Sequence, residues 1–323
     1  MTRELLILRH GKSDWNAGAD DFGRPLKNRG KRGAQRMGVW LLRHDMLPDT
    51  ILSSPAERAI VTAEKACKAM GMGTTTIIPD KRIYANSVDN LLQVLHDCPA
   101  EARRAMLVGH NPGLEELLIH LVEQPIPLAD DGKLLPTATL ARLRLDCRWD
   151  EAGAGCARVE AIVRPDTLPK KFPFPGPDGN ELRDRPAYYY TQSSVAPYRI
   201  RGNKMEILLI SSSKRKHWVI PKGIKEPGLT PQASAAREAL EEAGVEGEVG
   251  DEPIGSYAYE KWGAECSVDV YPMEVTRIIP EASWEERHRG REWVSVREAA
   301  ERLKQIEVKS IVLNLPGHLG KTV

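Results

Sequence analysis

The second half of this 323-residue chain is organised around residues 218–245, which read Trp218-Val-Ile-Pro-Lys-Gly-Ile-Lys-Glu-Pro-Gly-Leu-Thr-Pro-Gln-Ala-Ser-Ala-Ala-Arg-Glu-Ala-Leu-Glu-Glu-Ala-Gly-Val245. The first three residues predict a short apolar strand, and a loop rich in Gly and Pro follows it. A helix is expected next, with Thr230 as its N-cap, Pro231 at its first position and Gly244 at its end.

Two faces of this helix carry different side chains. Small and apolar residues recur at the i, i+3, i+4, i+7 spacing of a buried face, namely Ala236, Ala239, Leu240 and Ala243. Three carboxylates, Glu238, Glu241 and Glu242, share another face. They repel one another at neutral pH, and only Arg237 offers a counter-charge one turn away. A divalent cation would relieve this repulsion, and hard oxygen ligands favour magnesium or manganese.

The same stretch resembles a Nudix box, which runs Gly, five residues, Glu, seven residues, then Arg-Glu-apolar-any-Glu-Glu-any-Gly-apolar. The matching positions are Gly223, Arg237, Glu238, Ala239, Glu241, Glu242, Gly244 and Val245. Leu229 stands where the box has its first Glu, outside the part that binds metal. The resemblance implies that Mg²⁺ or Mn²⁺ is held by the Gly223 carbonyl, Glu238, Glu241 and Glu242. Arg237 would orient the carboxylates and Glu241 would serve in catalysis, although the identity of the general base stays open. The alternative is a solvated, Glu-rich helix.

Length and composition predict two domains with a mixed surface. The chain has room for about two domains of ordinary size. Its net charge of +1, with 28% charged residues, gives no reason to expect a general attraction to nucleic acid or to a membrane. Five scattered cysteines without a C-x-x-C pair argue against a disulfide framework and fit a reducing compartment. The apolar run near the N-terminus is too short for a signal peptide, so we expect a cytoplasmic protein.

The first half alternates strand and helix patterns. Leu5 to Leu8 is a continuous apolar run that predicts a buried strand, and residues 50–58 and 105–113 contain two further strand ends. Helical patterns lie between them, at 29–43, 56–70 and 88–95. The alternation predicts an α/β/α sandwich with a mostly parallel sheet.

Polar residues follow these strands directly, where ligands of open α/β sheets bind. His10 and Gly11 follow the first strand, Arg58 the second and His110 the third. A neutral histidine can attack phosphorus if positive charge surrounds the phosphoryl oxygens, and arginines such as Arg9 and Arg58 suit phosphate contact. These residues therefore predict phosphoryl transfer at His10, with a purely structural histidine as the alternative.

Residues 2–168 resemble the histidine phosphatase superfamily, and within it the small SixA-type phosphohistidine phosphatases. The matching motifs are Leu8-Arg-His-Gly-Lys-Ser13 with Asn16, Arg24-Pro-Leu with Gly30, Ser53-Ser-Pro-Ala-Glu-Arg58-Ala, Val108-Gly-His-Asn-Pro-Gly113 and Leu135-Pro-Thr-Ala-Thr-Leu140. The resemblance implies that His10 forms a phosphohistidine, and that the phosphate is held by Arg9, Arg58, His110 and Asn16. The acidic proton donor of larger relatives has no counterpart except Asp89. Its absence favours leaving groups that need little protonation, such as that of a phosphoramidate.

A Pro- and Gly-rich segment starts at Pro165 and predicts a semi-rigid linker. We therefore expect a phosphatase domain at 1–169, the linker at 170–187, and a Nudix domain at 188–323 that forms a second α/β/α sandwich with a mixed sheet. In the Nudix domain, apolar patterns predict strands at 187–199, 205–210 and 267–275, and helices at 296–303 and 308–315.

Two basic clusters flank the Nudix box, at residues 211–217 and 287–291. With Trp218-Val-Ile-Pro-Lys-Gly and Arg-Gly-Arg-Glu-Trp, they resemble the diphosphoinositol polyphosphate and diadenosine polyphosphate hydrolases. The resemblance implies phosphate contacts from Ser212, Ser213, Lys214, Arg215, Lys222, Arg289 and Arg291. The alternative for the first cluster is a solvated hairpin tip.

Together these patterns predict a bifunctional phosphohydrolase that combines a Mg²⁺-dependent Nudix domain with a histidine phosphatase. The expected Nudix substrate is a small polyphosphorylated molecule, such as a diadenosine polyphosphate or an inositol pyrophosphate. The alternatives are a nucleoside triphosphate-cleansing enzyme and a regulatory protein with one inactive domain. A phosphohistidine protein is an alternative partner of the first domain, and the oligomeric state stays open. Neither a nucleic-acid nor a membrane partner is expected.

Overall fold

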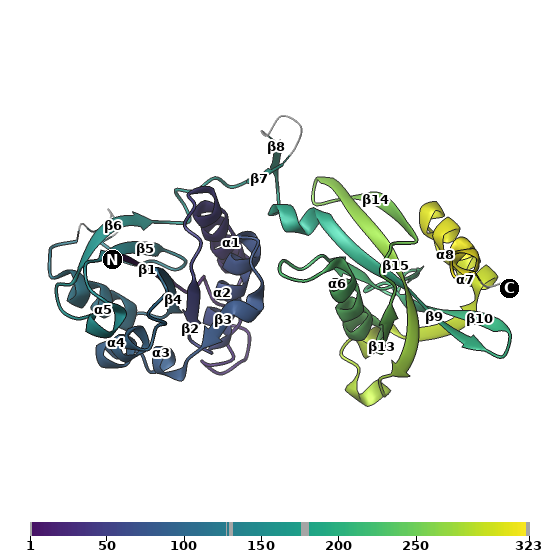
Figure 1. The fold of residues 1–323 in the computed structure, drawn as a ribbon, viewed down its shortest axis with the longest axis horizontal. Coiled ribbons are helices and arrows are strands. Elements are labelled where there is room, and N and C mark those ends of the chain that lie inside the picture. Colours follow the sequence, from purple (N-terminus) through teal and green to yellow (C-terminus); the bar gives the residue numbers. More distant parts are fainter. Residues whose placement is uncertain (1, 127, 129–131, 176–180, 321–323) are drawn as a thin grey trace. The chain divides into compact units, whose positions relative to one another are not determined.

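The computed structural model of the chain describes residues 2–126, 128, 132–175 and 181–320. It divides into two compact units, residues 1–172 and 173–323, each built around a central sheet (Figure 1). Residues 176–180 of the predicted linker lie outside the described residues. In the described part of the chain, no helix has the length and apolarity needed to cross a membrane.

The first unit contains a six-stranded sheet in the order β3-β2-β4-β1-β5-β6. Its strands are β1 (Arg3–Arg9), β2 (Thr50–Ser53), β3 (Ile77–Pro79), β4 (Arg104–Gly109), β5 (Leu140–Leu145) and β6 (Ala157–Val163). β1, β2, β3 and β4 are mutually parallel, whereas β5 and β6 continue the sheet in antiparallel pairings. The predicted mostly parallel sheet is confirmed.

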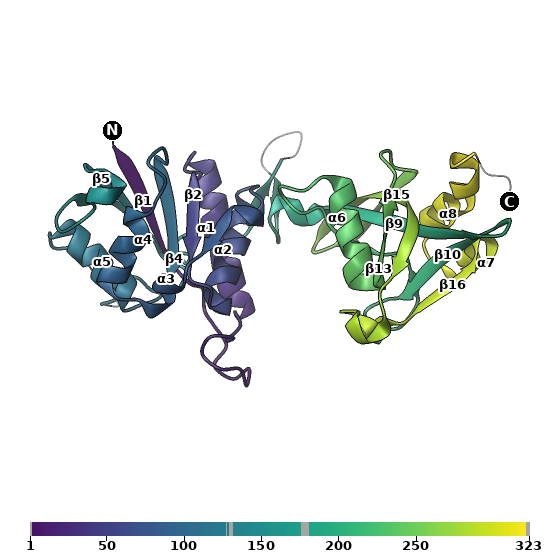
Figure 2. The same ribbon diagram turned by 60° about the horizontal axis from the view of Figure 1, so that its bottom comes forward.

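Helices cover both faces of this sheet (Figures 1 and 2). They are α1 (Asn28–Arg43), α2 (Glu57–Ala69), α3 (Lys81–Ala85), α4 (Val88–His96) and α5 (Gly113–Val122). Side chains of β1 alternate between the faces: Leu6 and Leu8 pack with α1 and α2, while Leu5 and Ile7 pack with α4 and α5. Because both faces of β1 are buried, its sequence is a continuous apolar run.

The second unit contains an eight-stranded mixed sheet. Its strands are β9 (Thr191–Arg201), β10 (Lys204–Ser211), β11 (Trp218–Val219), β12 (Lys222–Ile224), β13 (Val245–Val249), β14 (Gly255–Lys261), β15 (Ala264–Ile278) and β16 (Arg291–Ser295). β9 and β15 pair in parallel, and the other pairings are antiparallel. Two further strands, β7 (Phe172–Phe174) and β8 (Glu181–Arg183), pair with each other.

The sheet of the second unit lies between α6 (Pro231–Glu238) and the pair α7 (Val296–Arg302) and α8 (Ile306–His318) (Figure 2). Leu208 and Ile210 of β10 pack on the α6 side, and Ile207 and Leu209 pack with α7 and α8. The α/β fold with a mixed sheet is therefore confirmed. The strand expected from residue 187 begins at Thr191 instead, because residues 187–190 form a 3₁₀ turn.

The central helix follows its predicted boundaries but not its predicted buried face. Thr230 caps α6 by accepting a hydrogen bond from the Ala233 N–H, and Gly244 ends the helical segment at φ 61°. Residues 239–243 continue α6 as one turn of π-helix. The buried side chains are Ser234, Ala235, Ala239 and Ala243, whereas Leu240 is 39% exposed. Leu240 was therefore assigned to the wrong face, and Ala236 is half-buried.

Candidate active sites

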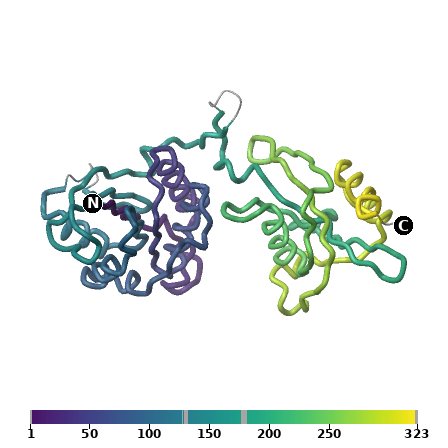
Figure 3. Tube along the Cα trace, in the orientation of Figure 1, coloured from purple at the N-terminus to yellow at the C-terminus, as the bar shows by residue number. Residues whose placement is uncertain are grey.

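His10 lies just beyond the end of β1, from which the chain runs through a loop to α1 (Figure 3). Its side chain is 8% exposed, and its Nδ1 lies 2.7 Å from the Gly11 carbonyl oxygen. Because a carbonyl only accepts hydrogen bonds, Nδ1 carries the proton and Nε2 keeps its lone pair. Gly11 itself must be a glycine, since a Cβ there would lie 2.6 Å from the carbonyl oxygen of Gly30.

The surroundings of His10 keep its imidazole neutral. Burial lowers the pKa of His10 to about 4; the hydrogen bond to Gly11 opposes this shift, while the charges of Arg58, Arg9 and Arg24 add to it. At neutral pH the ring is therefore uncharged, as a nucleophile at phosphorus must be.

Three arginines beside His10 present buried N–H groups without hydrogen-bond partners. The unpartnered atoms are Nε of Arg9, Nε and Nη1 of Arg24, and Nε of Arg58. Other donors of these residues are used, since Arg9 donates to the Leu135 carbonyl and Arg24 to Asp21. Buried donors without acceptors are costly, and an anion such as phosphate would satisfy them. Arg24 was not a predicted site residue, although its motif was recognised.

His110 completes this group from the loop after β4. Its ring centroid lies 5.1 Å from that of His10, and its Nε2 lies 2.7 Å from Ser54 Oγ. Its Nδ1 is buried without a partner. Burial, followed by the charge of Arg58, lowers the pKa of His110 to about 3. The neutral ring can therefore offer a hydrogen bond to an anion beside His10.

An acidic residue that the sequence did not single out lies at the same site. Asp21 accepts hydrogen bonds from Arg24, Arg58 and the Tyr84 hydroxyl, at 2.8, 3.0 and 3.1 Å. Burial opposes ionisation of Asp21, but the charge of Arg58 and the Tyr84 hydrogen bond outweigh it and lower the pKa of Asp21.

Two other residues named from the sequence are not drawn into this group. The side chain of Asn16 is exposed in the loop after β1, and Asp89 is exposed in the first turn of α4.

In the second unit, two carboxylates of the central helix face a cleft of about 530 Å³. Glu238 packs against Gly223, where a Cβ would lie 1.9 Å from Glu238 Oε1. Glu242 Oε2 accepts a hydrogen bond of 3.1 Å from the Lys222 backbone N–H. The Glu238 carboxylate thus occupies the space that a side chain at position 223 would need.

Cations surround the second of these carboxylates. Arg289 donates from Nη2 to Glu242 Oε1 at 2.6 Å, and the two side chains are 10% and 15% exposed. Lys222 donates from Nζ to the Tyr259 hydroxyl at 3.1 Å, and burial lowers the pKa of Lys222 although Glu242 opposes the shift. Lys222 and Arg289 both line the cleft.

The cleft brings together only part of the predicted set. From that set it contains Ser212, Ser213, Lys222, Gly223, Glu238, Glu242 and Arg289. It also contains residues that the sequence did not indicate: Gln192, Glu226, Tyr259, Lys261 and Trp262. Glu226 belongs to the loop that follows Gly223, whereas the other four come from segments distant in the chain, so only the three-dimensional fold reveals them.

The remaining predicted residues do not line the cleft. Glu241 pairs with Arg237 at 2.6 Å, one helical turn apart. Lys214 and Arg215 are exposed at the turn after β10. The guanidinium of Arg291 donates hydrogen bonds to the backbone carbonyls of Ala243, Gly244 and Ile279. These bonds stabilise the end of the helical segment.

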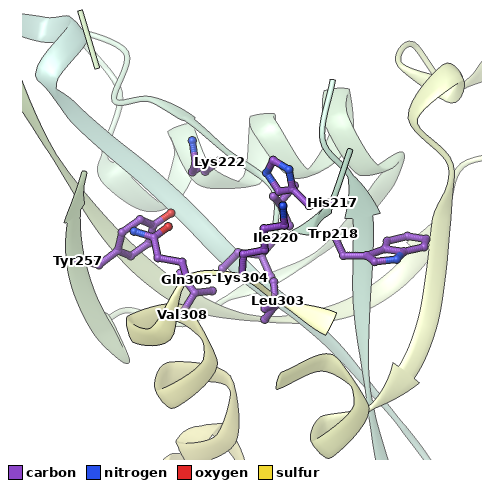
Figure 4. A pocket seen from close by; sticks show the side chains of 10 residues that line it. His217, Trp218, Ile220, Lys222, Tyr257, Leu303, Lys304, Gln305 and Val308 are labelled. Atoms are coloured by element: carbon purple, nitrogen blue, oxygen red, sulfur yellow. The ribbon is translucent and has the colours of Figure 1, made fainter. Parts of the chain in front are cut away.

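A smaller pocket of about 90 Å³ adjoins the cleft (Figure 4), and the residues common to the two linings are His217, Val219, Ile220, Lys222 and Gln305. Trp218, Tyr257, Leu303 and Val308 form much of its other wall. An apolar recess beside a charged cleft could receive a non-phosphate part of a ligand.

Glu238 and Glu242 fit a divalent cation. Burial, and then the charges of Glu242 and Glu241, raise the pKa of Glu238 to about 8. Burial also raises the pKa of Glu242, although Arg289 opposes this. Carboxylates held close together against their own repulsion suit Mg²⁺ or Mn²⁺. Within the described residues, no three His, Cys, Asp or Glu side chains form a ready-made metal cluster.

The two centres have the composition of phosphoryl-transfer sites, and family comparisons agree. Residues 191–313 match the NUDIX domain model, and residues 5–85 match the histidine phosphatase superfamily (branch 1). The chain belongs to the Nudix family, carries a histidine phosphatase domain before the Nudix domain, and is a two-domain phosphohydrolase.

Curated relatives match one domain or the other. The chain is 32% identical over 144 residues to Nudix hydrolase 12, mitochondrial, of Arabidopsis thaliana, a match that covers 37% of this chain and 70% of the relative. It is 44% identical over 70 residues to the 2,3-bisphosphoglycerate-dependent phosphoglycerate mutase of Mycobacterium tuberculosis, a match that covers 20% of this chain and 27% of the mutase.

Solved structures are similar to each half. A protein described as a SixA phosphohistidine phosphatase, from Nakamurella multipartitia, is 24% identical with a TM-score of 0.44, and the match covers 51% of this chain and 97% of that one. The C. elegans Ap4A hydrolase is 23% identical with a TM-score of 0.37, and the match covers 41% of this chain and 98% of that one.

Proposed function

We propose that the Nudix domain hydrolyses a phosphoanhydride bond in a polyphosphorylated small molecule, with Mg²⁺ or Mn²⁺ as cofactor. The observation that carries this proposal is the placement of Glu238 and Glu242 in one cleft with Lys222 and Arg289. Among the described residues that line the cleft are three carboxylates, Glu226, Glu238 and Glu242, and three cations, Lys222, Lys261 and Arg289. The protein charges therefore roughly cancel, and bound cations would make the cleft attractive to a polyphosphate.

The residues of this cleft would divide the work between them. When bound, the metal would neutralise phosphate charge and activate water for attack on phosphorus. Glu238 and Glu242 would hold it. Lys222, Lys261 and Arg289 would contact phosphate oxygens outside the metal site.

For the first domain, we propose hydrolysis through a phosphohistidine. The Nε2 lone pair of His10 attacks phosphorus while the bond from phosphorus to the leaving group breaks. Arg9, Arg24, Arg58 and His110 stabilise the phosphoryl oxygens throughout. Water then attacks phosphorus, which restores His10 and releases phosphate.

The leaving group would receive little help from the protein. Asp21 contacts Arg24 and Arg58 of this site, but its lowered pKa keeps it ionised at neutral pH, so it has no proton to give. This supports substrates with good leaving groups, of which a phosphoramidate is one, over simple alkyl phosphate esters.

The two activities could act in series. Cleavage of a diadenosine polyphosphate by the Nudix domain would leave a nucleoside polyphosphate, and the first domain would remove its terminal phosphate, which is bound as an anhydride and so has a good leaving group. A diadenosine polyphosphate or an inositol pyrophosphate is the favoured Nudix substrate. The recess in Figure 4 favours the former, since an inositol phosphate has no apolar part to place there. A nucleoside triphosphate is the second candidate, for the same reason.

Phosphate release from diadenosine tetraphosphate tests the series, because a single cleavage of this substrate gives two nucleotides and no inorganic phosphate. We would compare the full chain with His10→Ala at equal concentrations in Mg²⁺. The proposal expects both proteins to cleave the substrate, but only the full chain to release inorganic phosphate. Identical phosphate release by the two proteins would exclude action in series.

A further inference from the structure

A second pocket of the phosphatase domain lies beside the start of α1. It encloses about 280 Å³ and is lined by the first turns of that helix, by residues 136–139 and by residues 164–166. None of the arginines or histidines that surround the His10 ring lines it. Neither of the two proposed reactions uses it.

Positive charge dominates this pocket. Lys12, Arg29 and Arg36 line it, as do Lys133 and Arg164. Among the described residues of the lining, Asp166 is the single carboxylate. Arg36 donates to the Pro165 carbonyl at 3.3 Å rather than to an acid. Burial, and then the charges of Arg32 and Arg29, lower the pKa of Arg36, so the cations repel one another.

Polar groups of the pocket also lack partners. Thr139 is fully buried and lines the pocket, and its Oγ1 has no hydrogen-bond partner. The Nε of Arg36 is likewise buried without an acceptor. Helix α1 adds its first backbone N–H groups, since its N-cap, Lys27, makes no side-chain cap and its first turn has no acidic residue. A bound anion would satisfy all three sets of donors.

The pocket is close to the phosphatase centre through the backbone. Lys12 is two residues after His10, so their Cα atoms are at most about 7 Å apart. Ala138, in the opposite wall, donates its N–H to the carbonyl of His10 at 3.1 Å. A ligand with two phosphate groups could therefore place one in each site.

We propose that this pocket binds a phosphate group, as a second phosphate subsite of the histidine phosphatase domain. Guanidinium groups with hydroxyl and backbone N–H donors are the groups that recognise phosphate. This proposal depends on the proposed function in one respect, namely that the His10 site binds a phosphoryl group. The phosphate could belong to a bisphosphorylated substrate that reaches His10, or it could be a separate ion.

The test is calorimetric titration of the full chain with inorganic phosphate in EDTA. We compare the wild type with Arg29→Gln/Arg36→Gln, and with Lys31→Gln/Arg43→Gln as a control that removes the same charge from the same helix outside the pocket. The first variant should bind one phosphate fewer per chain, or bind that phosphate with an affinity lower by about tenfold or more, as expected for two lost charge-assisted contacts. The control should bind as the wild type does. Equal binding by all three proteins would overturn the proposal.

Two further arms separate the explanations. Thr139→Val keeps the shape of the side chain but removes its hydroxyl, so it should lower the affinity for the same phosphate. The thermal unfolding midpoint of this variant shows whether the fold is kept. Titration with adenosine 3′,5′-bisphosphate distinguishes the two sources of the phosphate. If one molecule binds per chain and prevents inorganic phosphate from binding at either site, the pocket holds part of a substrate that spans both sites. If inorganic phosphate still binds in the pocket, the phosphate there is a separate ion. Because the readout is binding, an enzyme that hydrolyses nothing would refute the proposed function and leave this inference standing.

Discussion

The pKa of His10 gives the sharpest quantitative prediction for the phosphatase domain. Burial and three arginines lower it from 6.5 to about 4. At pH 5, a histidine with its ordinary pKa would be only about 3% neutral, whereas His10 should stay about 90% neutral. The nucleophile should therefore survive a change from pH 7 to pH 5 almost undiminished.

The same shift makes the domain less stable in acid. The unfolded chain takes up a proton near pH 6.5, and the folded domain resists it until about pH 4. Stability should thus fall as the pH drops through this window, by about 3 kcal/mol for His10. His10→Asn should show a correspondingly smaller loss in urea denaturation between pH 7 and pH 4.

Nuclear magnetic resonance of ¹³C-labelled histidine measures the pKa directly. His10→Asn and His110→Asn assign the two resonances, which should not shift between pH 7 and pH 5. A His10 resonance that titrates with a midpoint near 6.5 would refute the reasoning from burial and neighbouring charge.

Three other substitutions, one of them with a matched control, test particular contacts. Arg289→Gln leaves the buried Glu242 without its guanidinium and should lower the free energy of unfolding by about 3 kcal/mol. Arg302→Gln, at a more exposed pair, should lower it clearly less. Urea denaturation in EDTA measures both, and equal costs would show that burial does not matter here. In the same experiment Thr230→Ala should cost about 1 kcal/mol, because it removes a helix cap; no change would contradict that role. Arg24→Gln should lower the affinity for inorganic phosphate about tenfold or more, measured by calorimetry. Unchanged affinity would show that this side chain does not contact the phosphate.

Local sequence patterns predicted much of the fold. The apolar run at Leu5 to Leu8 is β1, and the cap at Thr230 and the stop at Gly244 bound the helical segment. These signals depend on neighbouring residues, which the sequence contains directly. Leu240 was misplaced because the apolar spacing does not say on which side of Ala239 and Ala243 the buried face continues, and in the structure it continues toward Ser234 and Ala235.

The sites were predicted less completely than the fold. His10, Arg58 and His110 follow strand ends that the sheet brings to one edge, so their proximity could be inferred. Asp21 lies in a loop whose path the sequence does not specify. Conversely, Arg291 is in a basic cluster, yet its donors satisfy helix-end carbonyls. Charge clusters identify candidates but not the direction in which each side chain points.

Glu226 bears on the departure from the Nudix pattern at Leu229. It lines the cleft, and its charge contributes to the raised pKa of Glu238. A carboxylate three residues earlier in the loop thus reaches the cleft that contains Glu238 and Glu242, while Leu229 is 37% exposed. We expect Glu226→Gln to weaken Mn²⁺ binding, measured by electron paramagnetic resonance of the free ion, more than Glu260→Gln does at the end of β14.

We propose two separate centres in this chain, one that would require a metal and one that would not. The direct measurement is cleavage of diadenosine tetraphosphate, with and without Mg²⁺, by the wild type, Glu242→Gln and His10→Ala. We predict Mg²⁺-dependent cleavage by the wild type and His10→Ala, and none by Glu242→Gln, which should still form a phosphohistidine from phosphoramidate. Cleavage that survives in Glu242→Gln, or disappears in a folded His10→Ala, would contradict the separation of the two centres.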